Sequence, residues 1–145
     1  MSRGVDVLLL SVGGALGVNA RHWLATWMAT WAGARFPWAT FTINVSGSFA
    51  IGLFATLLAR WLPQHPARLF LLVGFLGGYT TFSSFALEGH TLWERREIAR
   101  SLGYLGGSVV AGFVAVVLGI MLGRAIIGPE AATMVVMDDV RGIEE

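Results

Sequence analysis

The sequence predicts an all-α integral membrane protein with four transmembrane helices. The chain has 145 residues, of which 55% are hydrophobic and only 13% are charged, whereas about 25% of the residues of a typical soluble domain are charged. Its mean hydropathy is +0.68. Four apolar stretches are also long enough to cross a membrane, since a hydrocarbon core of about 30 Å takes roughly 20 helical residues.

The composition excludes several other classes of protein. The high apolar content excludes a disordered chain, and the absence of cysteine excludes a disulfide-stapled module and thiol chemistry. A net charge of +1 gives no electrostatic footprint for nucleic acid. No nucleophile motif, phosphate-binding loop or catalytic pair of carboxylates occurs in the sequence. We therefore expect a protein that is not an enzyme.

Short connections rich in helix breakers separate the predicted spans, which cover about residues 5–27, 38–62, 69–92 and 101–127. The connections contain Gly33 and Pro37, then Pro63 and Pro66, then a charged run at residues 94–100. A signal peptide cleaved near Ala20 is the alternative for the first stretch. Residues 1–127 are thus expected to form one transmembrane domain, and residues 128–145 an acidic, disordered C-terminal tail.

Charge does not assign an orientation in the membrane. All ten basic residues are arginines, and four spans divide them almost evenly between the two sides, so the positive-inside rule gives no bias. Two alternatives remain open. The chain inserts in both orientations, which permits an antiparallel homodimer, or it takes one orientation set by the cluster of Arg95, Arg96 and Arg100.

Pairs of glycine at four-residue spacing predict close contacts between helices in lipid. The pairs are Gly13 and Gly17, Gly74 and Gly78, Gly103 and Gly107, and Gly119 and Gly123. The spacing leaves open whether each partner helix belongs to the same subunit.

The third span has an unusual polar centre. Gly77 and Gly78 are followed by Tyr79 and by four hydroxyl residues within positions 80–84. These residue types form helices poorly, and irregular backbone near the bilayer midplane is tolerated only where protein or a polar cavity covers it. A break would expose carbonyls to a cation and amides to an anion. The alternative is a continuous helix whose hydroxyls bond to the preceding turn.

A few other residues in the spans are candidates for function. Asn44 needs polar partners, which it finds either by joining helices or by contacting a permeating solute. Phe82 and Phe85 share a helical face, and the positive edges of their rings can face a small anion. Arg21 either extends to the headgroups or attracts anions in a vestibule. Glu88 is a further candidate. Because it lies near the end of its span, the alternative to a functional role is that it is a simple residue of the membrane interface.

Three motifs resemble those of the Fluc fluoride channels of bacteria, also called CrcB proteins. The first is Gly-Gly-Ala-Leu-Gly at residues 13–17, followed by Arg21, and the second is Thr-Phe-Thr-Ile-Asn at residues 40–44, with Gly47. The third covers residues 74–85, with Glu88. The resemblance extends over about residues 8–127, which is nearly the whole chain apart from the tail.

This resemblance implies an antiparallel homodimer with two pores, a broken third helix, and a structural sodium ion at the centre of the dimer. By position, the backbone carbonyls of Gly77 and Thr80 would hold the sodium. The residues expected along the fluoride pathway are Asn44, Thr81, Phe82, Ser83, Phe85, Tyr104 and Ser108, with Arg21 and Glu88 in the vestibule. Gly112 departs from the family, because some members have a hydroxyl residue at this position.

The residues and the resemblance together predict a passive channel that exports cytoplasmic fluoride across the inner membrane of a bacterium. Neutral donors would replace the water of the ion, and several weak sites would let the ion leave again. A proton-coupled exporter of small cations is the alternative, and it would need a carboxylate embedded in the first helix. A packing subunit without transport activity is a third possibility, but it leaves the polar centres of the spans unexplained.

Overall fold

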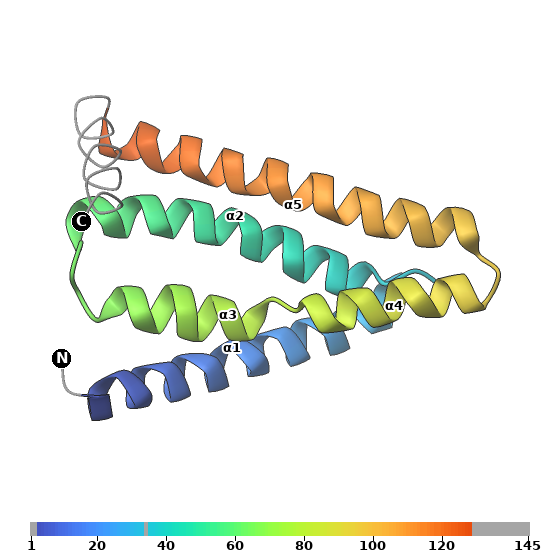
Figure 1. The fold of residues 1–145 in the computed structure, drawn as a ribbon, viewed down its shortest axis with the longest axis horizontal. Coiled ribbons are helices and arrows are strands. Elements are labelled where there is room, and N and C mark those ends of the chain that lie inside the picture. The colour runs from blue at the N-terminus through green and yellow to red at the C-terminus, as the bar shows by residue number, and fades with distance from the viewer. Residues whose placement is uncertain (1–2, 34, 129–145) are drawn as a thin grey trace.

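The computed structural model describes residues 3–33 and 35–128, which form four helical spans, each antiparallel to the next in sequence (Figure 1). The first two spans are single helices, α1 (Arg3–Ala32) and α2 (Trp38–Trp61). The third consists of a π-helical segment, η1 (Leu69–Phe75), followed by α3 (Leu76–Tyr79) and α4 (Phe82–Glu94), and the fourth is α5 (Ile98–Ile127). All four spans are long and apolar enough to cross a membrane. The prediction of a four-span, all-helical protein is therefore confirmed.

Several helices extend further than the sequence predicts. The first continues to Ala32 rather than residue 27, α4 includes Glu94, and α5 begins at Ile98 rather than residue 101. The charged run that we expected to form the last connection thus contributes residues to both helices. A helix can continue beyond the hydrocarbon core, because water and headgroups solvate its charged side chains there. Of the expected tail, only Gly128 lies within the described residues.

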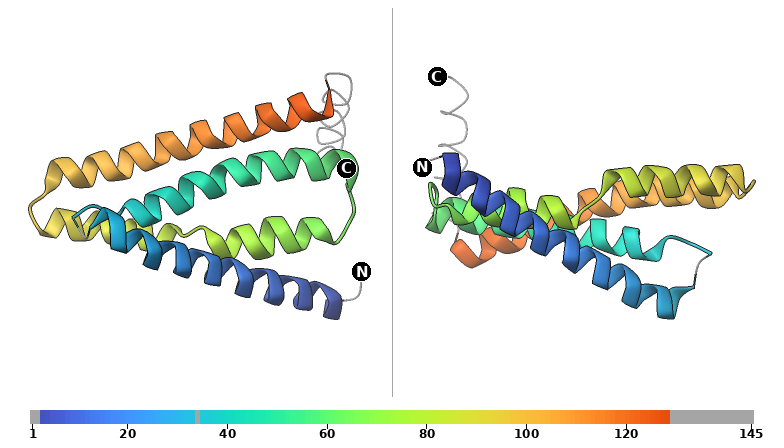
Figure 2. Two further views of the ribbon diagram at one scale, coloured as in Figure 1. Left: turned by 180° about the vertical axis from the view of Figure 1, so that it is seen from behind. Right: turned by 90° about the horizontal axis from the view of Figure 1, so that it is seen from below.

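The spans pack in two antiparallel groups. Helix α2 packs along α5, and α1 packs against η1 and α3, while α4 lies against the first turns of α5 (Figure 1). At the end that holds connections 33–37 and 95–97, α1 and α2 diverge from α4 and α5 (Figure 2). This divergence matters below, because a cavity lies between the two connections.

Three of the four glycine pairs lie at contacts within this chain. A Cβ atom added at Gly17 would overlap the Phe75 carbonyl, and one added at Gly119 would overlap the Phe49 carbonyl. Gly78 packs on the backbone of Gly14 in the same way. A Cβ at Gly103 or Gly107 would meet nothing within 4 Å. The question that the spacing left open is thus answered for the first, second and fourth pairs.

The outer surface is apolar, as a membrane setting requires. All six tryptophans are exposed, as are aliphatic residues along α1 and α5 such as Leu8 and Val110. The buried hydrophobic core is small and includes Ile43, Leu76 and Tyr104. Lipid rather than water is therefore the solvent that suits this surface.

Candidate functional site

Two residues with extended backbone angles separate α3 from α4. Thr80 has φ −79° and ψ 157°, and Thr81 has φ −150° and ψ 116°. The Thr81 hydroxyl caps α4 by accepting a hydrogen bond of 3.3 Å from the Ser84 amide. This interruption, residues 80–81, directs backbone amide and carbonyl groups away from the helix axis and toward neighbouring side chains.

Asn44 of α2 binds the interruption with both ends of its amide. Its Nδ2 donates to the Thr81 carbonyl at 3.0 Å, and its Oδ1 accepts from the Thr81 amide at 2.9 Å. In a continuous helix, the Thr81 amide would donate to the carbonyl four residues earlier, which is that of Gly77. Because Asn44 takes this amide, the Gly77 carbonyl loses its helical donor. Asn44 thus joins α2 to the interruption of the third span.

Arg21 lies against the same interruption. Its Nη1 donates to the Thr80 carbonyl at 3.3 Å, and its side chain is half-buried. Because α1 continues to Ala32, Arg21 lies well before the end of its helix. A position this far inside the helix favours a contact with the interruption over an extension to the headgroups.

The interruption opens onto a cavity of about 530 Å³ between α2, the third span and α5. Phe82 and Phe85 contact each other, with ring centroids 5.5 Å apart, but Phe82 is 78% exposed and Phe85 only 7%. Most of the predicted pathway and carbonyl residues line this cavity, namely Asn44, Gly77, Thr80, Thr81, Phe82, Phe85 and Ser108. Ser83 and Tyr104 do not line it, and the Ser83 hydroxyl lies 3.4 Å from that of Thr81.

Two hydroxyl groups on facing helices give this cavity polar character. The Ser108 Oγ is buried and has no hydrogen-bond partner among the described residues, although buried hydroxyls nearly always have one. At Gly112, one turn further along α5, an added Cβ would lie 3.4 Å from the Ser48 Oγ. Ser48 also lines the cavity, so α2 supplies a hydroxyl beside the position where α5 has none.

Glu88 is the centre of a second polar cluster. Its carboxylate accepts hydrogen bonds from the Thr40 hydroxyl at 2.8 Å and from the Tyr104 hydroxyl at 2.7 Å. Glu88 is half-buried, and these two bonds join it to α2 and α5. Sequence reasoning did not assign a role to Thr40, although it precedes Asn44 by one helical turn and shares its face of α2. It also missed the bond of 2.9 Å between the Ser46 and Tyr79 hydroxyls.

Tyr104 connects the two polar regions. It is fully buried, at 0% exposure, and its ring centroid lies 5.3 Å from that of Phe85 and 5.5 Å from that of Phe36. Phe85 lines the large cavity, whereas Glu88 lines a second cavity of about 270 Å³ at the diverging ends of the helices. A series of neutral donors and aromatic rings therefore lies between two cavities, which suits weak, repeated contacts with a small anion.

Residues 8–120 match the protein family described as "CrcB-like protein, Camphor Resistance (CrcB)". The chain is also similar to proteins named fluoride-specific ion channel FluC. It is 47% identical to that of Nitrobacter winogradskyi over 121 residues, which are 83% of this chain and 96% of the relative. It is 49% identical to that of Paracoccus denitrificans over 119 residues, or 82% and 94% of the two chains. For Chloroflexus aurantiacus the identity is 41% over 120 residues, or 82% and 95%.

Proposed function

The chain belongs to the CrcB-like family, and from this premise we propose that it is a fluoride-selective channel that exports cytoplasmic fluoride passively across the bacterial inner membrane. The relatives named as fluoride-specific channels support the choice of ion. The observation that carries the proposal is the large cavity, in which the amide of Asn44, the unpartnered hydroxyl of Ser108 and two phenyl rings come together. A proton-coupled exporter finds no support, because the only carboxylate described in α1 is Asp6, in its first turn.

The proposed pathway runs from the large cavity past Phe85 and Tyr104 to Glu88. Fluoride holds its water strongly, so a pore must offer donors in its place. Hydroxyls and ring edges do so without fixed positive charge, and each contact stays weak enough for the ion to leave. Ser83 is placed at the exposed edge of the route, where its hydroxyl reaches that of Thr81.

We propose that two protomers inserted in opposite directions complete the pores. One protomer leaves the cavity residue Phe82 78% exposed, and a second copy would supply the missing wall. Gly103 and Gly107 have open space around them, which suits a close approach of another helix. The even division of the arginines is consistent with insertion in both directions. In this dimer, the interruption at residues 80–81 would act as the broken third helix.

A structural sodium ion would fit the carbonyls of Gly77 and Thr80. Both residues line the large cavity, and Asn44 takes the amide that would otherwise occupy the Gly77 carbonyl. The Thr80 carbonyl accepts from Arg21 and keeps a second lone pair. Carbonyls released from unwound helices are known ligands of sodium. The ion would supply positive charge that holds the two interruptions together, and a higher thermal stability of the purified protein in sodium than in potassium would support its presence.

Reconstituted liposomes test the proposal directly. Vesicles loaded with fluoride should release it rapidly without a proton gradient, while vesicles loaded with chloride should retain their ion. A fluoride electrode and a chloride electrode follow the two reactions. Vesicles that hold fluoride as tightly as protein-free ones would contradict the proposed function, and release that depends on a proton gradient would favour an exporter.

Substitution of the rings tests the pathway. We expect Phe82→Ile and Phe85→Ile each to reduce fluoride release by about tenfold or more, because an aliphatic side chain has no positive ring edge. Since Phe82 is exposed, Phe82→Ile should fold normally, as size-exclusion chromatography can check. Trp93→Ile is a matched control, because Trp93 is an exposed aromatic residue of the same helix that does not line the cavity. Unchanged release in both ring variants would contradict the proposed route.

A further inference from the structure

The second cavity carries positive charge that the proposed pathway does not explain. Its volume is about 270 Å³, and its wall combines residues of the connection between α1 and α2 with residues of α4. Arg35 comes from the connection and Arg95 from the end of α4, and both line the cavity together with Glu88. Two arginines and one glutamate thus line one small cavity.

Both arginines lie next to residues with defined contacts. The Arg95 amide donates to the Thr91 carbonyl at 3.1 Å, which holds it on the last turn of α4. Next to Arg35, the ring of Phe36 lies 4.5 Å from that of Trp38 and 5.5 Å from that of Tyr104. The connection is therefore anchored on the same tyrosine that binds Glu88.

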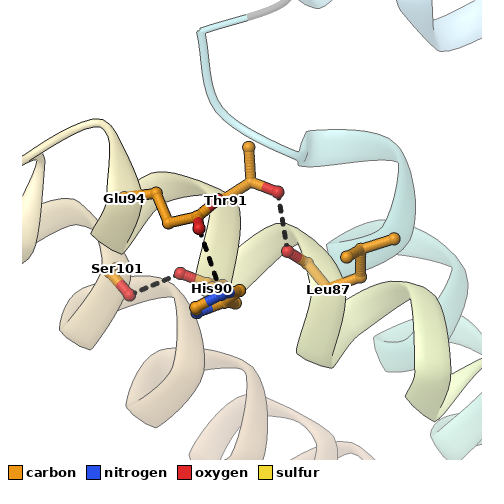
Figure 3. Close-up of polar contacts among 6 residues, drawn as sticks. Leu87, His90, Thr91, Glu94 and Ser101 are labelled. Atoms are coloured by element: carbon orange, nitrogen blue, oxygen red, sulfur yellow. Dashed lines mark hydrogen bonds and ion pairs between the residues drawn. The ribbon is translucent and has the colours of Figure 1, made fainter.

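The neighbouring carboxylates of Glu94 and Glu97 do not line the cavity. Glu94 faces His90, at 3.5 Å from its Nε2, along one side of α4 (Figure 3). Glu97 pairs with Arg100. Among the described residues, neither Arg35 nor Arg95 forms a salt bridge. The cavity therefore has an excess of positive charge beside a carboxylate that already accepts two hydrogen bonds.

Glu88 alone would repel an anion that approaches Tyr104 from this end. We propose that Arg35 and Arg95 form an anion-collecting mouth, which offsets this repulsion and raises the local concentration of fluoride at the entrance to the Glu88 cluster. A cleft lined by one sign of charge focuses its field and increases the rate at which oppositely charged ions arrive. This inference rests on the proposed function. The proposed effect depends on the positive charge of the two side chains and not on the geometry of any hydrogen bond that they form.

The test compares fluoride release by single variants of the two arginines at two ionic strengths, because removal of one charge at a time disturbs the balance between the two ends of the molecule least. At about 10 mM salt the Debye length is about 30 Å, so the mouth acts at full range, whereas at about 1 M salt it falls to about 3 Å. Arg35→Gln and Arg95→Gln should each reduce release about twofold or more at low salt and leave it unchanged at high salt. Arg35→Lys and Arg95→Lys should each keep the low-salt rate of the wild type, because lysine keeps the charge.

Arg96→Gln is the matched control, because Arg96 is adjacent, exposed and equally charged but does not line the cavity. It should change release much less than Arg35→Gln or Arg95→Gln. All three arginines are exposed, so the variants should fold, and size-exclusion chromatography checks that they do. Wild-type protein that releases no fluoride would overturn the proposed function itself. If the wild type conducts, the mouth alone would be overturned by glutamine variants that match the wild type at low salt, by a deficit that persists at high salt, or by lysine variants that show the same deficit.

Discussion

At the scale of single residues, Asn44 and Glu88 illustrate how a polar side chain in a membrane span organises its surroundings. Asn44 satisfies the amide and the carbonyl of Thr81, which a helix would otherwise pair within itself. Glu88 accepts one hydrogen bond from a hydroxyl group of α2 and another from a hydroxyl group of α5. An unpaired polar group in hydrocarbon costs several kcal/mol, so each of these side chains ties separate elements together at one point.

Two substitutions of Asn44 distinguish the contributions of the two hydrogen bonds that its amide forms. Asn44→Ala should leave the Thr81 amide and carbonyl without these partners, at a cost of about 1–3 kcal/mol for each group. Asn44→Asp can still accept from the Thr81 amide but cannot donate to its carbonyl. We therefore expect the thermal stability of the purified protein to fall in the order wild type, Asp, Ala. An alanine variant as stable as wild type would show that these bonds contribute little.

Arg96 is the one described residue other than glycine with a positive φ, at 64°. It follows α4, whose last turn is closed by the hydrogen bond from the Glu97 amide to the Leu92 carbonyl. A left-handed conformation costs a residue with a side chain roughly 1–2 kcal/mol, and glycine adopts it freely. Arg96→Gly should therefore raise the thermal stability of the purified protein. Arg95→Gly, where φ is −73°, should lower it, and the opposite ranking would contradict this explanation.

At the scale of elements, the spans could be predicted because each one is a long apolar run between breakers, and the bilayer sets its length. The Glu88 cluster could not be predicted, because its partners lie 48 and 16 residues away in sequence. The contacts of the glycine pairs could be predicted only in part. Their spacing identified packing faces, but only the fold shows that Gly119 meets α2 while Gly103 faces open space.

This difference between glycines predicts that the same substitution destabilises the protein at one position and not at the other. In Gly119→Ala, the added methyl group would overlap the Phe49 carbonyl, and backbone cannot move aside as a flexible side chain can. Overpacking of this kind costs typically 1–3 kcal/mol. We expect this variant to show a lower yield of folded protein and a lower thermal stability. Gly106→Ala is the control, because it lies on the same helix with nothing within 4 Å. Equal behaviour of the two variants would argue against the α2–α5 contact.

At the scale of the whole molecule, the near-equal charge of the two ends is the property on which the proposed antiparallel dimer depends. One end holds Arg60 and Arg68, and the other holds Arg96 and Arg100, in addition to the arginines of the second cavity. Positive residues in short connections favour the cytoplasmic side. A change of two charges at one end should therefore be enough to bias every copy toward one orientation.

Oppositely biased variants test this dependence. Arg60→Gln with Arg68→Gln should insert with connection 95–97 inside, and Arg96→Gln with Arg100→Gln should insert the other way. Because each variant alone would then lack an inverted partner, cells that express only one of them should lose fluoride export. Coexpression should restore it, because the two populations can pair antiparallel. Protease accessibility of a tag at one terminus reports the orientation of each variant. If each variant is fully oriented and still exports fluoride alone, the protomers do not need to be antiparallel.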